Sequence, residues 1–451
     1  MALIVQKFGG TSVSSPERIR AAAERVARAR RNGDRVVAVI SAIGDTTDRL
    51  VELAGTVAPH AAGTRRREMD QLLATGEQAA SALVALALEE RGVPAVSLTG
   101  PQAEILTDAS HSAARIVRIR GRRVQAALEQ GRVPVVAGFQ GLSRAREVTT
   151  LGRGGSDTTA VALAVALGAD RCDIFTDVDG IYSADPRIVT GARRYDRLEH
   201  REAFLLTLAG AAVLHPRAAA LAAEHRLPLR VLLGSAAPDI ESGTLIEGES
   251  PVEGPRILGV AEAGASARLR LEGLAAGAAA SAAVLSTLAT ADIPVEHLDD
   301  ERTADGTRRL DIIVAGDRAG EARKALEAAL DDGIRIEVAP AVARVTVVGT
   351  GLSACGAALG LALQRLAAEG IEPEAMGFSE LGLTLYLLPD EAGRASRILH
   401  DTLLGDREAR PRAGVLAASG AAPGASAAAP HAGTISDAST APAPQPRRRS
   451  A

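Results

Sequence analysis

Two short glycine-containing segments carry residue types that bind phosphate. The first, Lys7-Phe8-Gly9-Gly10-Thr11-Ser12, follows an apolar run at residues 2–5. The chain has 51 Lys and Arg residues, but only Lys7 and Lys324 are lysines. A strand followed by a lysine, two glycines and hydroxyls offers a compact ammonium and open backbone N–H groups to phosphate oxygens. Taken alone, the segment also fits a strand that ends in a solvated lysine and a turn.

The second segment is Gly152-Arg153-Gly154-Gly155-Ser156-Asp157-Thr158-Thr159, which leads into an Ala/Val-rich stretch. Ser156 or Asp157 can cap a helix there, and the loop N–H groups would form an anion site at its positive end. The Arg153 guanidinium can hold a carboxylate or phosphate through two parallel hydrogen bonds. A simple capped turn needs fewer of these residues, so the segment predicts an anion-binding loop.

Three further segments add polar groups. Residues 175–187 offer carboxylates, a hydroxyl, a phenol and an arginine, which suit a nucleotide, although the turn pairs Asp179-Gly180 and Asp185-Pro186 also fit an ordinary polar loop. Residues 41–48 place hydroxyls after an apolar run. Glu77, in Thr75-Gly76-Glu77, can bind an ammonium group or lie on a solvated helix face.

Alternating apolar patterns indicate the elements that position these groups. We expect strands at residues 2–5, 35–41, 95–98, 133–137 and 171–175, and helices at 16–31, 68–90, 115–129 and 156–167. Strands that alternate with helices predict an α/β fold with a mostly parallel sheet covered on both faces. Ligands bind at the carboxyl ends of such strands, where the glycine-rich segments lie.

The second half of the chain has a different texture. Residues 247–251 resemble a linker, and two βαββα-like units follow at about 256–338 and 339–404. This internal repeat predicts two ferredoxin-like α+β units. Residues 405–451 are rich in Ala, Pro, Ser and Gly, so we expect a disordered tail.

Bulk composition narrows the class of protein. The net charge of −4 and an aromatic content of 2% give no reason to expect nucleic acid or an anionic membrane as a partner. Two cysteines are too few for a disulfide framework or a structural zinc site. We find neither an N-terminal signal pattern nor an apolar run of about 18 residues, so we expect a cytoplasmic protein.

In order and spacing, the five segments resemble those of aspartate kinases (aspartokinases) of the amino acid kinase superfamily. The resemblance covers about residues 2–247, with weaker similarity to paired ACT domains over 256–404. It implies a three-layer αβα amino acid kinase domain at 1–247 and two ACT-type units. It also implies ATP-dependent phosphorylation of the β-carboxylate of L-aspartate, with Mg²⁺ entering mainly on ATP, no dedicated protein metal site, and a homodimer formed through the ACT-like units.

The resemblance assigns roles residue by residue. Lys7, Asp157 and Arg153 would be catalytic. The substrate would contact Ser41, Thr47, Glu77, Arg153, Gly154, Gly155 and Ser156. The nucleotide would contact Lys7, Phe8, Gly9, Gly10, Thr176, Asp177, Tyr182, Ser183, Ala184, Asp185, Pro186 and Arg187.

The chain also departs from the family pattern. Ala212 stands where relatives carry a nucleotide-binding lysine, Leu205 replaces an acidic residue, and Leu232-Leu233-Gly234 replaces an Arg-Ser-Ser strand end. His215 and Arg217 are nearby candidates to substitute for the missing lysine.

In the ACT-like half, residues 275–279 lack the usual Asp-x-Pro-Gly loop, and Asp300-Glu301 replaces the effector-binding Gln-Asn pair. Ser379-Glu380 survives in the second unit. Because a buried effector needs its charged groups satisfied, we expect weak or absent feedback by lysine and threonine.

Two other hypotheses stay open. The chain would be a paralogue that phosphorylates another acidic amino acid, or a non-catalytic regulatory partner of a working kinase. Ala212 favours the second alternative, whereas Lys7, Arg153 and Asp157 argue against it.

Overall fold

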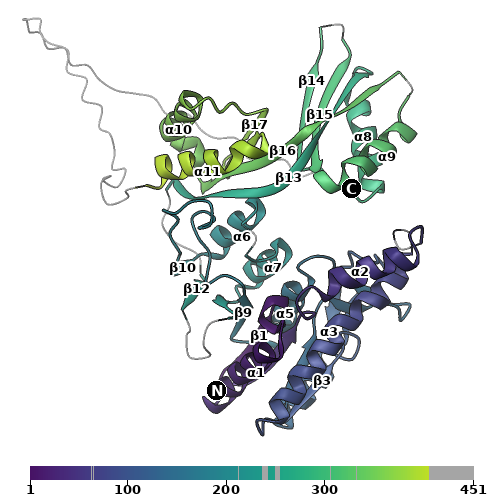
Figure 1. Cartoon of the computed structure of the whole chain (residues 1–451), viewed down its shortest axis with the longest axis vertical. Helices are drawn as coiled ribbons and strands as arrows, with labels where there is room; N and C mark the ends of the chain where they lie inside the picture. The colour runs from purple at the N-terminus through teal and green to yellow at the C-terminus, as the bar shows by residue number, and fades with distance from the viewer. Residues whose placement is uncertain are drawn as a thin grey trace, which may run out of the picture. The chain divides into compact units, whose positions relative to one another are not determined.

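The computed structural model describes residues 1–405 apart from 62, 64, 212, 236–241, 249–253, 305 and 332 (Figure 1). Ala212, most of the predicted linker and nearly all of the predicted tail therefore lie outside the described residues.

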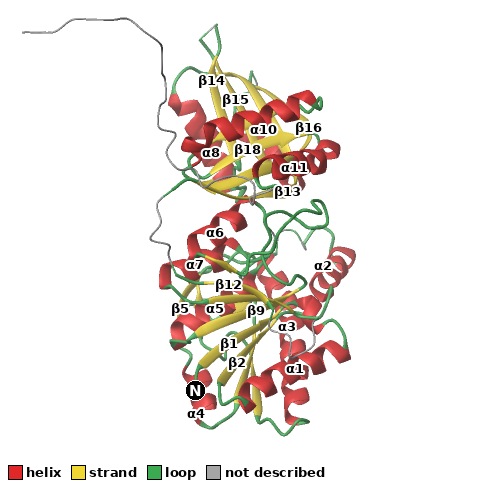
Figure 2. Ribbon diagram, turned by 90° about the vertical axis from the view of Figure 1, so that its left-hand side faces the viewer, coloured by secondary structure: helices red, strands yellow, loops and turns green. Residues whose placement is uncertain are grey.

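The N-terminal half is built on an eight-stranded sheet, and all of its strand pairs are parallel except β11 with β12. In spatial order the strands are β10 (Arg197–Leu198), β12 (Gly243–Ile246), β11 (Leu229–Leu233), β9 (Arg171–Thr176), β1 (Leu3–Phe8), β2 (Arg35–Ile40), β6 (Val133–Ala137) and β3 (Ala95–Leu98). Figure 2 shows these strands fanned between layers of helices.

Two apolar clusters hold the helices against opposite faces of this sheet. One face packs against α1 (Pro16–Arg31) and α3 (Arg66–Glu89). The other face packs against α4 (Arg122–Glu129), α5 (Gly155–Leu167), α6 (His200–Ala209) and α7 (Pro216–His225). The short α2 (Thr46–Val57) packs on α3. The expected αβα layering and mostly parallel sheet are confirmed.

A second, four-stranded sheet lies beside the main one, in the order β5 (Ile116–Ile119), β4 (Ile105–Thr107), β7 (Gln140–Leu142) and β8 (Val148–Thr150). No sequence pattern predicted this sheet, and the helix predicted at 115–129 is wrong in its first half. Residues 116–119 form strand β5, and α4 begins only at Arg122 after Gly121 with a φ of 62°.

The C-terminal half is a six-stranded antiparallel sheet with helices, as the two ferredoxin-like units predicted. Its order is β14 (His297–Arg302), β15 (Arg308–Ala315), β13 (Arg256–Leu274), β16 (Arg335–Thr350), β18 (Gly382–Leu387) and β17 (Ala375–Phe378). One apolar cluster packs α8 (Ala278–Thr290) and α9 (Ala319–Ala329) on the sheet, and another packs α10 (Gly356–Ala368) and α11 (Pro389–Leu403).

Strand β13 serves both units of this half. Its first part, from Arg256 to Ala263, pairs with β16 at residues 344–350, whereas its second part pairs with β15 and with the first part of β16. The predicted units therefore share one sheet, and the boundaries at 338 and 339 stay a prediction.

Among the described residues, α3 is the one helix long and apolar enough, by length and composition, to cross a membrane. Here it packs against α1, β3 and β8, and it carries the buried carboxylates of Asp70 and Glu77. It thus packs within the N-terminal half.

Candidate active site

Lys7 reaches the site because side chains alternate along β1. Val5 lies in the cluster with α5, whereas Phe8 lies in the cluster with α1. Lys7 follows Val5 by two residues and faces the same side. Its Nζ lies 2.6 Å from Oδ1 of Asp157 in the first turn of α5, and the two side chains are only 10% and 12% exposed. The two residues predicted to be catalytic from distant segments therefore form a nearly buried ion pair.

The turn after β1 brings bare backbone next to this ion pair. The Gly9 N–H donates to the Phe175 carbonyl at 3.0 Å, which joins the first predicted segment to the start of the third. A Cβ on Gly9 would lie 3.3 Å from the Lys7 ammonium, and one on Gly10 would lie 3.0 Å from the carbonyls of Ala42 and Gly44. A side chain at either position would crowd these atoms, so the two glycines keep the backbone open beside Lys7.

The predicted anion loop lies at the N-terminus of α5. Gly154 has a φ of 65°, and a Cβ there would overlap the ring of His215. Gly155, Ser156 and Asp157 are buried, and α5 has no side-chain cap. Arg153 is exposed and has no hydrogen-bond or ion-pair partner among the described residues. The Gly155 N–H already donates to the Gly152 carbonyl at 3.0 Å. The positive helix end and the unengaged guanidinium suit a bound anion.

Glu77 is a buried carboxylate on α3 that faces the 41–48 segment. Its Oε1 accepts from the Ala42 N–H at 3.0 Å, and its Oε2 has no hydrogen-bond partner among the described residues. Burial raises the pKa of Glu77 to about 7. Ser41, just before Ala42, and Thr47, at the start of α2, are half-buried. A buried carboxylate oxygen with no partner suits a cationic ligand group.

In the 175–187 segment, most of the polar side chains predicted to bind the nucleotide are at least partly exposed. Thr176, half-buried, donates through its hydroxyl to the exposed Asp177, and the hydroxyl of Tyr182 donates to Asp179 at 2.9 Å. Asp185 and Arg187 pair with each other, and Pro186 is exposed.

Ser183 and Ala184 are buried, and the Ser183 hydroxyl accepts from the Arg193 N–H and lies 2.9 Å from Nε2 of His400. The side chains of both residues face the protein. Their predicted contacts with the nucleotide stay predictions.

Sequence patterns predicted no role for Arg194 or Asp70. Arg194 pairs with Asp179 at 3.1 Å, and Asp70 on α3 is fully buried. Arg217 was proposed to substitute for the missing lysine, but its guanidinium donates to the carbonyls of Leu151 and Ala114. None of these follows a motif, since each is recognised only when loops far apart in sequence meet.

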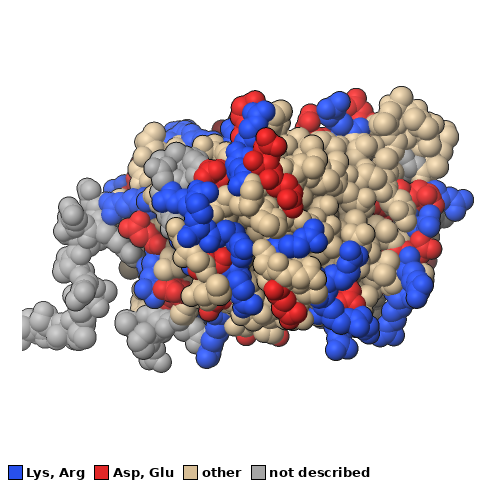
Figure 3. Space-filling view, turned by 90° about the horizontal axis from the view of Figure 1, so that it is seen from below, with Lys and Arg blue, Asp and Glu red and all other residues tan. Residues whose placement is uncertain are grey.

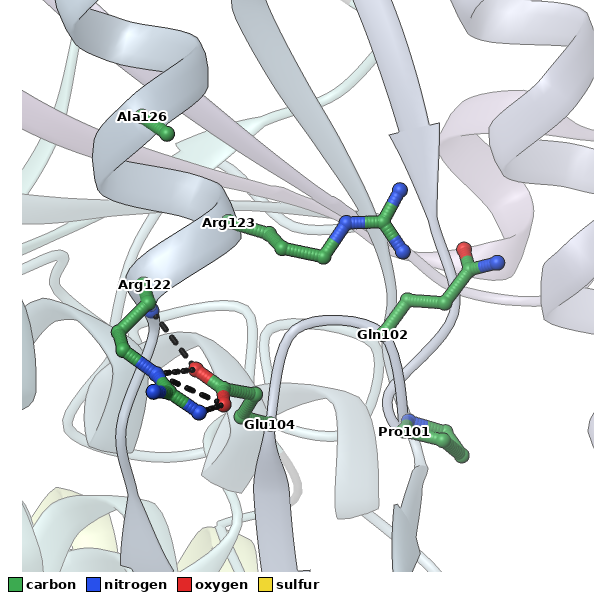
Figure 4. A pocket seen from close by; sticks show the side chains of 6 residues that line it. All are labelled: Pro101, Gln102, Glu104, Arg122, Arg123 and Ala126. Atoms are coloured by element: carbon green, nitrogen blue, oxygen red, sulfur yellow. Dashed lines mark hydrogen bonds and ion pairs between the residues drawn. The ribbon is translucent and has the colours of Figure 1, made fainter.

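Two surface features lie outside the site. A pocket of about 710 Å³ is lined by Pro101, Gln102, Glu104, Arg122, Arg123 and Ala126, and Figure 4 shows the Glu104–Arg122 ion pair among these residues. None of the predicted site residues lines this pocket. Basic and acidic side chains are interspersed over the face in Figure 3, in keeping with the small net charge.

Comparison with known proteins places this geometry in a family. Residues 2–232 match the amino acid kinase family. Aspartokinase of Mycobacterium tuberculosis is 39% identical over 429 residues, which cover 92% of this chain and 99% of that protein. Aspartokinase 2 of Bacillus subtilis is 40% identical over 404 residues, which cover 89% and 97%.

A solved structure of E. coli aspartokinase III in complex with aspartate and ADP, described as the R-state, matches with a TM-score of 0.75 and 25% identity over 89% of this chain and 99% of that one. The chain therefore belongs to the amino acid kinase family and, within it, to the aspartokinases.

Proposed function

We propose that this chain transfers the γ-phosphoryl group of ATP to the β-carboxylate of L-aspartate and forms 4-phospho-L-aspartate, the first step of aspartate-family amino acid biosynthesis. The observation that carries the proposal is the buried Lys7–Asp157 ion pair between the Gly9-Gly10 turn and the α5 N-terminus. A carboxylate nucleophile is already ionised at neutral pH and needs no general base. Catalysis then depends on positioning and on neutralising the charge of the transferring group, which Lys7 would supply.

The aspartate backbone would be held at both ends. Glu77, with one buried oxygen free, would pair with the ammonium group. Arg153, assisted by the loop at Gly154, Gly155 and Ser156, would hold the α-carboxylate. Ser41 and Thr47 would donate to substrate or phosphoryl oxygens. The aspartate and ADP in the E. coli relative support this assignment of ligands.

The nucleotide would lie along the 175–187 segment. Thr176, Asp177, Tyr182, Asp185 and Arg187 offer the polar groups for its base edge, ribose and phosphates. Phe8 stacks on Phe175 with ring centroids 4.8 Å apart, which fixes the Gly9-Gly10 turn beside this segment.

Magnesium would enter as the ATP complex. It would neutralise phosphate charge and keep several of its water ligands, as the ion prefers. Among the described residues no three His, Cys, Asp or Glu side chains gather into a metal site. On this chain, Asp157 would orient Lys7 or the metal-bound phosphates.

Two acidic residues of the C-terminal half, Asp300 and Glu301, bear on regulation. Asp300 is engaged by Ser281 and Arg308, and Glu301 pairs with Arg309, so both acidic replacements of the effector-binding pair are already used within the unit. Their carboxylates accept hydrogen bonds but cannot donate them to an effector carboxylate. Weak or absent feedback by lysine and threonine is therefore part of the proposal, as are a homodimer formed through these units and a cytoplasmic location.

A hydroxylamine-trapping assay for acyl phosphate tests the function. With MgATP, L-aspartate should give hydroxamate, whereas N-acetyl-L-aspartate, which has no ammonium group for Glu77, should give little. Stronger product with L-glutamate would favour the paralogue that uses another acid. No product with either acid would favour the non-catalytic partner, which Ala212 in place of lysine also favours.

A further inference from the structure

Asp70 is a buried carboxylate that the site described above does not use. It lies on α3 and is 0% exposed. Three groups donate to it. The Ser112 N–H reaches both carboxylate oxygens at 3.0 and 3.1 Å, the Thr150 hydroxyl donates at 2.6 Å, and Nδ1 of His111 lies at 2.7 Å. A carboxylate only accepts, so His111 donates from Nδ1. This set of donors compensates the cost of burying a charge in an apolar layer.

The donors come from two loops that meet beside the anion loop. His111 and Ser112 lie between β4 and β5, and Thr150 ends β8. The Ala114 N–H donates to the Thr150 carbonyl at 2.9 Å, and a Cβ on Gly152 would lie 3.1 Å from the Ser112 carbonyl. Asp70 therefore fixes the chain three residues before Arg153. On the other side of these loops, Arg217 donates to the carbonyls of Leu151 and Ala114.

Glu77 lies on the same helix as Asp70. Asp70 and Glu77 are seven residues apart on α3, so they lie two turns apart on one face of that helix. The Asp70 carboxylate thus joins the helix that carries Glu77 to the loop that carries Arg153. Ser112 has a φ of 70°, which is uncommon for a residue with a Cβ, and its N–H bonds to Asp70 hold it there.

We propose that Asp70 is a positioning residue that sets the separation between the ammonium anchor and the α-carboxylate anchor of the amino acid substrate. This inference rests on the proposed function, because it takes Glu77 and Arg153 as those anchors. Asp70 does not touch the substrate. It acts through Thr150 and the 108–114 loop, so replacing Asp70 should weaken the binding of aspartate more than the binding of ATP.

The test compares two neighbouring threonines. Thr150→Val removes the hydroxyl that donates to Asp70. Thr149→Val is the matched control, because Thr149 is also buried and its hydroxyl bonds to Thr107 at 2.6 Å instead. In the hydroxamate assay, Thr150→Val and Asp70→Asn should each raise the KM for aspartate on the order of tenfold, with the KM for ATP within about twofold.

Thr150→Ser, which keeps the hydroxyl, should restore the wild-type KM, and Thr149→Val should leave it unchanged. An unchanged KM for aspartate in Thr150→Val, or an equal rise in Thr149→Val, would overturn the proposal. If Asp70→Asn fails to fold, the pair of threonine variants still decides the question.

Amide hydrogen exchange separates this inference from the proposed function, because it needs no substrate. Thr150→Val should speed exchange of the Ser112 N–H and of residues 152–155, and Thr149→Val should not. Unchanged exchange in Thr150→Val would refute the positioning role by itself. If the wild type forms no hydroxamate from aspartate, the proposed function fails, while the exchange result still shows whether Asp70 fixes the loop.

Discussion

Ser183 Oγ lies 2.9 Å from Nε2 of His400, so one buried contact joins the 175–187 segment to α11. The backbone reinforces it, because the Ser183 carbonyl accepts from the Val260 N–H at 2.8 Å. The segment that we expect to bind the nucleotide is thereby attached to strand β13 and helix α11 of the C-terminal half. A movement of β13 or α11 would therefore displace Ser183.

This contact predicts a pH effect on stability. Burial lowers the pKa of His400 below its ordinary value, so folding disfavours its protonated form. Its stabilising contribution is fully present above about pH 6.5 and is lost as the pH falls below that value. His400→Gln, which does not titrate, should flatten the fall in the free energy of unfolding between about pH 6.5 and 5. Urea unfolding across this range measures it, and His225→Gln, on an exposed histidine, should keep the wild-type slope.

Replacing Lys7 should abolish most of the activity. Lys7→Ala removes the ammonium that faces Asp157, and loss of one such charge-stabilising group lowers kcat by about 10²- to 10³-fold. The chain offers a matched control, because the other lysine, Lys324, is exposed on α9. Lys324→Ala should retain wild-type kcat in the same assay. Equal activity of the two variants would remove Lys7 from the mechanism.

Glu77 should make aspartate binding depend on pH. With its pKa raised to about 7 by burial, Glu77 of the free enzyme takes up a proton as the pH falls through 7, and the protonated form cannot pair with an ammonium. The KM for aspartate should therefore rise from pH 8 to pH 6. A flat KM over this range would show that Glu77 is not the ammonium anchor.

The same group should affect stability in the opposite sense. A carboxyl whose pKa is raised on folding stabilises the native state most below its ordinary pKa of about 4.5, and this contribution is lost as the pH rises to about 7. Glu77→Gln should therefore be more stable than the wild type at pH 8, by on the order of 3 kcal/mol, and the difference should shrink toward pH 5. Urea unfolding at the two pH values checks the sign.

Glycines at the two ends of α5 separate local strain from damage to the site. Gly154 and Gly168 have φ of 65° and 62°, but a Cβ on Gly154 would overlap the His215 ring, whereas one on Gly168 meets nothing within 4 Å. Gly168→Ala should cost about 1 kcal/mol of stability and leave kinetics unchanged. Gly154→Ala should lower kcat/KM for aspartate by on the order of tenfold or more, because it displaces the anion loop. Similar kinetics for both would argue against a role of that loop.

Feedback control gives a further test. With Asp300 and Glu301 engaged within their own unit, lysine plus threonine should not reach half-inhibition below about 1 mM, a level that corresponds to roughly −4 kcal/mol of binding. Strong inhibition of this chain under the same conditions would contradict the prediction.

The sequence by itself predicted the αβα layering, the mostly parallel sheet and the two glycine-rich segments that lie beside Lys7. Helix α1 was predicted at its observed bounds, because its apolar period and the Pro16 start are local signals. Lys7, the Gly9-Gly10 turn and the 152–159 loop were identified from residue types alone, since phosphate binding demands a cation, bare backbone and a helix N-terminus in short segments. The long alternation of strands and helices likewise indicated the parallel sheet.

Only the tertiary structure decided how these segments are connected. Residues 116–119 became a strand because β4 supplies its hydrogen bonds, which no local pattern announces. Arg217, proposed as a substitute for the missing lysine, donates instead to the Leu151 carbonyl, and Ser183 contacts His400. Both contacts join residues far apart in sequence. Asp70 shows the physical reason most clearly: a carboxylate within a helix becomes a fixed, buried group only when folding brings donors from two other loops around it.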